Sequence, residues 1–173
     1  LPIESNRIAF TTDSYVVKPL FFPGGDIGKL SVCGTINDLA VAGAKPLFLS
    51  CSLMLEEGFE IDKLENIIKS MKNIAQEAGV KIVTGDTKVV DKGAIDQLFI
   101  NTAGIGICND LELGIDKIEI GDKVIINGTI GEHGIAVISK REGLTFESSI
   151  ESDCAPLNGL IGSIIQGTKG VKF

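Results

Sequence analysis

The sequence has little of what several common functional classes require. It contains a single histidine, His133, which excludes a zinc site built from several histidines. Its four cysteines form no Cys-x-x-Cys pair and stand among apolar or small residues, so we expect reduced, mostly buried thiols and a cytoplasmic location. The chain has 16 lysines and arginines against 23 aspartates and glutamates. This net charge of -7 disfavours nucleic acid as a partner.

Long apolar runs are also absent. No stretch approaches the roughly 20 residues that a membrane-spanning helix needs, so no membrane anchor is expected. The first residues lack a charged segment leading into an apolar one, so no signal peptide is expected either. Because the chain starts at Leu1 rather than at a methionine, we expect its natural beginning to lie further upstream.

What remains is an ordinary globular composition, with 44% hydrophobic and 23% charged residues, which argues against disorder and coiled coil. The apolar pattern breaks at residues 109–121, and we predict two domains there, at residues 1–110 and 111–173. The second would have little core of its own, which indicates that the chain stops early. Within it we expect a strand at 123–127 and helices at 135–141 and 155–166.

Periodicity predicts the elements of the first domain. An apolar stripe at helical spacing ends at Gly79, and Asp62 with Glu65 indicates a capping box at its start. Another helix is expected to begin at about Leu30. Apolar or alternating runs indicate strands at residues 7–13 (with continuation to 17 left open), 47–55, 80–90 and 96–108, the last two forming a hairpin.

Asp38 stands in the middle of the helix that begins at about Leu30, opposite its buried stripe. Its neighbours four residues before and after are Gly34 and Ala42, so almost no side-chain bulk surrounds the carboxylate and a large ligand could approach it. The alternative is a solvated charge on the outer face of a surface helix.

Two further carboxylates have similar settings. Asp13 follows the first strand, where it could serve as a ligand or belong to a turn. Asp86 follows Gly85 in a strand, and Lys88 would project from the same side, so a solvent-facing ion pair is the alternative to a site. Hard divalent cations such as Mg²⁺ prefer carboxylate oxygens, but spacing alone does not bring these residues together.

The loop at residues 18–29 invites comparison with a nucleotide-binding P-loop. The comparison fails, because Leu30 follows Lys29 where a Ser or Thr is needed, and Pro23 stands where a Gly is needed. Backbone N–H groups and Lys29 near a helix start would still favour an anion. A flexible loop with a solvated lysine is an equal alternative.

Several ordered motifs resemble known families. The segments at residues 11–19, 28–40, 43–46 and 85–89 resemble the ATP-binding superfamily of aminoimidazole ribonucleotide synthetase and thiamine-phosphate kinase. The segments at 21–26 (Phe-Phe-Pro-Gly-Gly-Asp), 128–136 and 152–157 resemble, within it, the HypE family of hydrogenase expression/formation proteins.

The resemblance implies an α+β fold, a mixed β-sheet packed on helices, followed by part of a second α/β domain. Two copies would pair their sheets into a barrel-like homodimer, with ATP and Mg²⁺ near the interface. The residues at the matching positions are, for the metal, Asp13, Asp38 and Asp86, and, for the nucleotide, Lys29, Asn37, Thr87 and Lys88.

It also implies a reaction: the ATP-dependent dehydration of an S-carboxamide on the protein's own C-terminal cysteine to a thiocyanate, the source of the cyanide ligand in nickel-iron hydrogenase. A carbamoyltransferase and iron-scaffold proteins would be partners. This chain ends at Phe173 without that cysteine and lacks the family's glycine-rich N-terminal segment, so we do not expect it to complete the reaction alone.

His133 and Asp153 lie in the HypE-like motifs and are candidates to face the modified cysteine. Alternatively, His133 only caps or closes a turn. We expect Cys154 to be buried rather than nucleophilic, because no base can be assigned beside it. Two other functions stay open, a kinase or synthetase of the same superfamily and a non-catalytic dimerisation or scaffold domain.

Overall fold

A computed structural model describes residues 7–108, 113–168 and 170–172. The elements in chain order are β1 (Ile8–Tyr15), β2 (Phe21–Phe22), β3 (Gly25–Asp26), α1 (Ile27–Val41), β4 (Ala44–Glu56), α2 (Ile61–Glu77), β5 (Lys81–Val90), β6 (Leu98–Cys108), the 3-10 helix η1 (Ile115–Lys117), α3 (Glu132–Glu142) and α4 (Asn158–Gly167). None of the described helices is long and apolar enough to cross a membrane.

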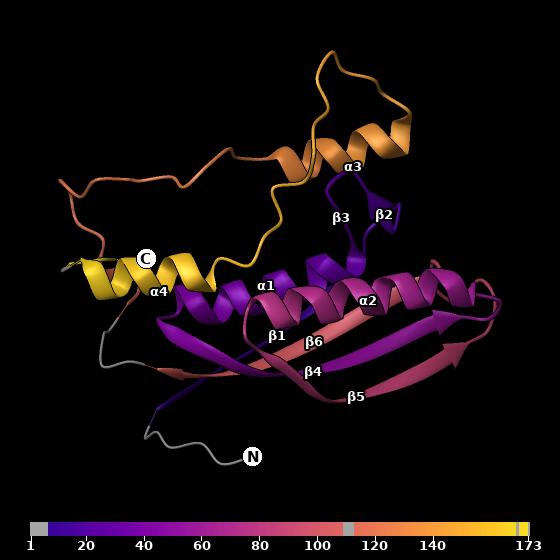
Figure 1. The fold of residues 1–173 in the computed structure, drawn as a ribbon, viewed down its shortest axis with the longest axis horizontal. Coiled ribbons are helices and arrows are strands. Elements are labelled where there is room, and N and C mark those ends of the chain that lie inside the picture. The colour runs from indigo at the N-terminus through magenta and orange to yellow at the C-terminus, as the bar shows by residue number, and fades with distance from the viewer. Residues whose placement is uncertain (1–6, 109–112, 169, 173) are drawn as a thin grey trace.

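The first half of the chain forms a four-stranded mixed sheet in the order β1-β6-β4-β5. β6 is antiparallel to β1 and β4, whereas β5 is parallel to β4. Helices α1 and α2 lie side by side on one face of this sheet (Figure 1). The predicted α+β fold is therefore confirmed.

The predicted hairpin between β5 and β6 is wrong. After α2 the chain returns as β5 parallel to β4, on the outer edge of the sheet, and β6 then inserts between β4 and β1. The β5–β6 connection is held by Glu56, whose carboxylate accepts hydrogen bonds from the backbone N–H groups of Gly93 (2.7 Å) and Gln97 (3.2 Å). Gly104 suits β6 to this central place, because a Cβ there would lie 2.8 Å from the Thr35 side chain of α1.

The core lies between the helices and the sheet, where α1 contributes fully buried side chains such as Ile27 and Ile36, and α2 contributes Ile67. Helix α1 begins earlier than predicted because the Asp26 carboxylate caps it, accepting from the N–H groups of Gly28 (2.7 Å) and Lys29 (3.0 Å). Gly28 is tightly enclosed, since a Cβ there would lie 2.6 Å from the Ile67 carbonyl oxygen.

Helix α2 forms at the predicted place, but without the predicted capping box. Glu60 is at its N-cap position and makes no side-chain capping bond, so Asp62 lies in the first turn instead. The helix is stabilised by packing, because Ile67, Met71 and Ile74 all face the core.

In the second half, α3 and α4 form close to the predicted helices, but the strand expected at residues 123–127 does not form. Val124 and Ile125 are 93% and 88% exposed, and a strand needs a neighbour to pair its backbone groups, which the described residues do not supply there. Residues 109–112 of the predicted domain boundary lie outside the described residues, and the division into two domains stays a prediction.

Candidate functional site

Asp13 and Asp38 lie along one seam between β1 and α1. The Thr11 hydroxyl donates to Asp38 Oδ2 (3.3 Å), and Tyr15 Oη lies 3.2 Å from Thr35 Oγ1, so the residues at positions 11, 13 and 15 face the helix. Asp13 thus stands within a strand rather than in a turn, and its Oδ1 accepts a hydrogen bond from the backbone N–H of Ser14 (2.7 Å). Both carboxylates are exposed. The seam therefore presents two acceptor-only groups to solvent.

Tyr15 lies beneath these carboxylates and is almost completely buried. Burial raises its pKa to about 12, and the nearby Asp13 carboxylate contributes in the same direction. Its hydroxyl also explains why a glycine stands at position 34, because a Cβ there would lie 2.2 Å from Tyr15 Oη. The sequence predicted that Gly34 leaves space around Asp38 for a ligand; the structure shows that the tyrosine occupies the space at Gly34.

Asp86 lies at the far edge of the sheet. Asp13 and Asp86 belong to neighbouring rows of residues that run across the four strands. The first row is Asp13, Thr102, Cys51 and Gly85, and the next is Ser14, Asn101, Ser52 and Asp86. Three strand spacings separate β1 from β5, roughly 14 Å, and neighbouring rows point to opposite faces. The three aspartates therefore do not meet within one chain, and no metal-binding group of three His, Cys, Asp or Glu occurs among the described residues.

Asp86 and Lys88 form an ion pair on the edge strand β5, with Lys88 Nζ 3.1 Å from Asp86 Oδ2. The hydrogen bond from Lys88, and then the backbone N–H of Thr87, hold the pKa of Asp86 below its ordinary value. The solvent-facing pair that the sequence left open is thus present, and both side chains remain exposed. Gly85 allows close strand contact, since a Cβ there would lie 1.9 Å from the Cys51 carbonyl oxygen.

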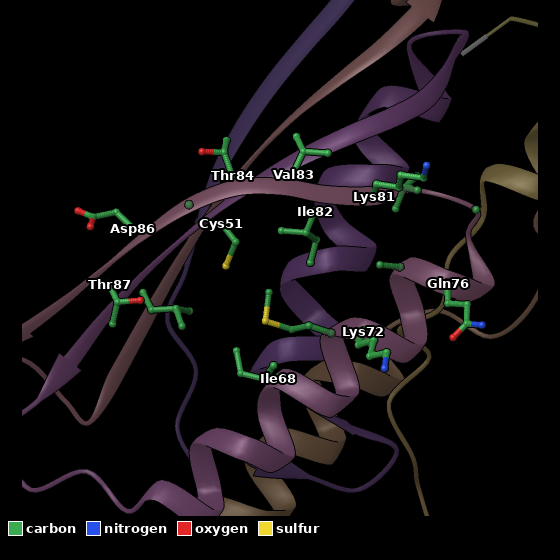
Figure 2. A pocket seen from close by; sticks show the side chains of 16 residues that line it. Cys51, Ile68, Lys72, Gln76, Lys81, Ile82, Val83, Thr84, Asp86 and Thr87 are labelled. Carbon is green, nitrogen blue, oxygen red and sulfur yellow. The ribbon is translucent and has the colours of Figure 1, made fainter. Parts of the chain in front are cut away.

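A groove of about 1250 Å³ runs between α2 and β5 and ends near Asp86 and Thr87. Figure 2 shows Cys51 and Ile82 pointing from the strands toward Ile68 of α2, whereas Asp86 points away from the groove. Its floor is mainly apolar, and Lys72 and Gln76 lie along its helical side. Sequence reasoning missed this groove, because the apolar stripe of α2 indicated only core packing.

Lys29 lies in the first turn of α1 and donates from Nζ to the carbonyl oxygen of Gly24 (2.9 Å). The N–H groups at this helix start, which the sequence favoured as an anion site, already hold the Asp26 carboxylate of the same chain. The Lys29 ammonium could still contact an external phosphate by giving up its bond to Gly24, and that role stays a prediction.

Asn37 holds a distant segment, residues 151–158, which we call the strap. Its Nδ2 donates to the Ala155 carbonyl oxygen (2.9 Å), and its Oδ1 accepts from the Leu157 N–H (2.8 Å). The strap also donates from the Ser152 N–H to the Pro23 carbonyl oxygen (2.9 Å). Both polar atoms of the Asn37 amide thus have structural partners, and its predicted contact with nucleotide stays untested.

His133 and Asp153 are brought together where α3 lies beside β2 and β3 (Figure 1). The Asp153 carboxylate accepts from the backbone N–H of His133 (3.1 Å), in the first turn of α3, whereas the imidazole Nδ1 lies 3.0 Å from Ser152 Oγ. The ring also stacks edge-on against Phe22, with centroids 5.1 Å apart. This geometry gives His133 a structural role at a helix start, and its catalytic role stays a prediction.

Cys154 of the strap packs against the core beside Cys33 of α1. This contact and burial raise the pKa of the Cys33 thiol well above its ordinary value. All four cysteines are free, but only Cys33 is buried; the other three are partly buried, so the expectation of mostly buried thiols is wrong. The pair adds a further attachment between α1 and the strap.

Comparison with known protein families and solved structures defines the class of protein to which the chain belongs. Residues 1–108 match the family described as AIR synthase related protein, N-terminal domain. The fold is also shared with thiamine monophosphate kinase from Aquifex aeolicus, at a TM-score of 0.64 and 18% identity over 94% of this chain and 52% of that one. The mixed sheet with two helices on one face is therefore the fold of the AIR synthase related N-terminal domain.

Close relatives narrow the class. Carbamoyl dehydratase HypE of Bradyrhizobium diazoefficiens is 52% identical over 99% of this chain and 50% of its own length. The crystal structure of Escherichia coli HypE superposes with a TM-score of 0.92 at 50% identity, over 98% of this chain and 52% of that one. A HypE structure in complex with ATP gives a TM-score of 0.92 at 49% identity, over 95% of this chain and 49% of that one.

The chain belongs to the HypE family of hydrogenase maturation proteins. It spans about half the length of the curated relatives that it matches.

Proposed function

We propose that this chain supplies the ATP-binding part of a carbamoyl dehydratase, a lyase that converts an S-carboxamide on a C-terminal cysteine to a thiocyanate for the cyanide ligand of nickel-iron hydrogenase. One observation carries the proposal: the predicted ligands for Mg²⁺ and ATP are divided between two edges of one sheet. Asp13 and Asp38 lie at the β1 edge, and Asp86, Thr87 and Lys88 lie on the β5 edge.

A homodimer would bring the two edges together. The sheet face opposite α1 and α2 carries exposed apolar side chains, including Phe10 (66% exposed), Ile8 (57%) and Met54 (38%), which a second copy would cover. In such a pair, the β5 edge of the partner subunit lies beside β1, and its Asp86 joins Asp13 and Asp38.

The residues at both edges suit magnesium. They are exposed carboxylates, which are hard oxygen ligands, and Mg²⁺ is commonly held by one or two carboxylates together with substrate phosphates. Asp13, Asp38 and Asp86 would hold the ion, which when bound neutralises phosphate charge. Thr87 and Lys88 would orient the phosphates, because they adjoin Asp86 on the same exposed strand.

The α2–β5 groove is suited to the base of the nucleotide. Its floor is apolar, as most small-molecule sites are, and it ends at Asp86 and Thr87, where the phosphates would begin. Lys29 would reach a phosphate by exchanging its contact with the Gly24 carbonyl oxygen. In this arrangement the base lies on one subunit, whereas Asp13, Asp38 and Lys29 come from the other.

The remaining assignments follow the family resemblance. His133 and Asp153 would stand close to the modified cysteine, supported by the strap that joins them to the Gly24 loop. One solved complex contains HypE together with HypF, covering 95% of this chain at 57% identity. We propose a carbamoyltransferase and iron-scaffold proteins as partners of this chain, and the cytoplasm as its location.

Calorimetric titration with ATP and Mg²⁺ tests the proposal. The unaltered protein is expected to bind, and Asp38→Asn to weaken binding by about tenfold or more, because a neutral amide is a poor magnesium ligand. Asp62→Asn, an exposed aspartate in the first turn of α2, is the matched control and should bind within about twofold of the unaltered protein. Absence of binding, or equal binding by Asp38→Asn, would leave only a scaffold function.

A further inference from the structure

Three buried hydroxyl groups form a chain beneath the Asp13–Asp38 seam. Tyr15 Oη lies 3.2 Å from Thr35 Oγ1, Thr35 Oγ1 lies 2.5 Å from Thr102 Oγ1, and Thr102 Oγ1 donates to the Ser31 carbonyl oxygen (3.1 Å). Thr35 and Thr102 have no exposed surface, and Tyr15 is 7% exposed. The chain joins one residue from each of β1, α1 and β6.

The hydrogen bonds of this chain have one direction. The Ser31 carbonyl oxygen can only accept, so Thr102 donates to it, Thr35 donates to Thr102, and Tyr15 donates to Thr35. Each threonine hydroxyl thus donates once and accepts once. An apolar side chain of the same shape would leave buried neighbours without a partner, which is costly away from water.

The three hydrogen-bonded hydroxyls link the strand that carries Asp13 to the helix that carries Asp38. Thr102 stands opposite Asp13 in the β1–β6 register, and Thr35 precedes Asp38 by three residues, close to one helical turn. Thr11, two residues before Asp13 on the same face of β1, donates to Asp38, so a second hydrogen bond joins β1 to α1 at the seam. The position of β1 relative to α1 at the seam is therefore fixed by hydroxyl geometry as well as by packing.

We propose that Thr35, with Tyr15 and Thr102, is a positioning residue that sets the separation of Asp13 and Asp38 for Mg²⁺. This inference rests on the proposed function. None of the three hydroxyls contacts the metal or the nucleotide; each acts through the strand or helix that carries a carboxylate. Mg²⁺ requires near-ideal ligand geometry. A displacement of a few tenths of an ångström between β1 and α1 therefore reduces the affinity for Mg²⁺ more than it reduces the stability of the fold.

The test compares Thr35→Val, which keeps the shape and removes the hydroxyl, with Thr35→Ser, which keeps the hydroxyl. The readout is the Mg²⁺ concentration that gives half-maximal ATP binding, measured below the thermal unfolding midpoint of each variant. Thr35→Val is expected to raise this concentration by about tenfold, and Thr35→Ser to leave it within about twofold. If the Thr35 hydroxyl served the fold alone, Thr35→Val would lower the unfolding midpoint without changing the Mg²⁺ concentration that gives half-maximal ATP binding.

Tyr15→Phe keeps the test available if Thr35→Val does not fold, because it removes only the first hydroxyl of the chain. It is expected to raise the half-maximal Mg²⁺ concentration by about threefold or more. An unchanged Mg²⁺ requirement in every folded variant that lacks a hydroxyl would overturn the positioning role. If the unaltered protein showed no Mg²⁺-dependent ATP binding, the proposed function itself would fail, and that result is distinguishable from a failure of the positioning role.

Discussion

Asp13 and Asp86 lie on opposite edges of one four-stranded sheet, in neighbouring rows of its strand register, and therefore point to opposite faces. The separation across β1, β6, β4 and β5 is roughly 14 Å. A single metal ion contacts its ligands at little more than 2 Å, so these two carboxylates can share an ion only if they come from different copies of the chain.

The pKa of Tyr15, the only tyrosine, should be measurable by ultraviolet titration after a rapid pH jump. Burial raises this pKa to about 12, so the native phenol is expected to titrate near there, and the unfolded phenol near its ordinary value of about 10. Because the unfolded state loses its proton first, the stabilising contribution of the neutral phenol is complete below about pH 10 and is lost between about pH 10 and 12. A native midpoint near 10 would show that the phenol is not buried.

Gly34→Ala is expected to reduce the free energy of unfolding by about 1–3 kcal/mol, because the new Cβ would lie 2.2 Å from Tyr15 Oη. Gly162→Ala in α4, where a Cβ would meet nothing within 4 Å, is the control and should be neutral or slightly stabilising. Tyr15→Phe in the Gly34→Ala background should recover part of the loss. Equal denaturant midpoints for the two glycine variants would contradict this packing.

Asn37→Leu should release the strap from α1. It removes the bonds to the Ala155 carbonyl oxygen and the Leu157 N–H, so the Leu157 amide should exchange its hydrogen about tenfold faster or more. Asn73→Leu, on the exposed side of α2, is the control and should leave that exchange unchanged. If Asn37 instead serves the nucleotide alone, Asn37→Leu will weaken ATP binding without affecting the exchange of Leu157.

Local signals predicted most elements of the first half, and local chemistry explains the errors. The spacing of Ile67, Met71 and Ile74 was enough to predict α2. The start of α1 differs from the prediction because Asp26 follows two glycines, a pattern typical of a loop, although its carboxylate caps the helix. The strand order could not be predicted, because the insertion of β6 between β1 and β4 depends on contacts between distant residues, such as that between Gly104 and Thr35.

The sequence suggests which residues make up the candidate site, an assignment that stays a prediction, but it does not show how they are arranged. The sequence indicated all three aspartates, yet their division between two edges follows from sheet topology alone. It also indicated Asn37, but gave no sign that this side chain holds the strap, because the partners are more than a hundred residues away. The hydroxyl of Thr35 lies on the buried face of α1, where sequence patterns indicate packing rather than positioning.

Complementation between two binding-deficient variants tests most directly whether the ATP site is shared between two copies. Asp38→Asn and Asp86→Asn, each tested alone, are expected to weaken Mg²⁺-dependent ATP binding by about tenfold or more. When they are refolded together, half of the dimers combine one chain of each kind, and each of these has one site with both aspartates intact. Calorimetry of the mixture should then recover about one quarter of the sites of the unaltered protein. No recovery from a mixture that forms dimers, or full binding by Asp86→Asn alone, would contradict the shared site.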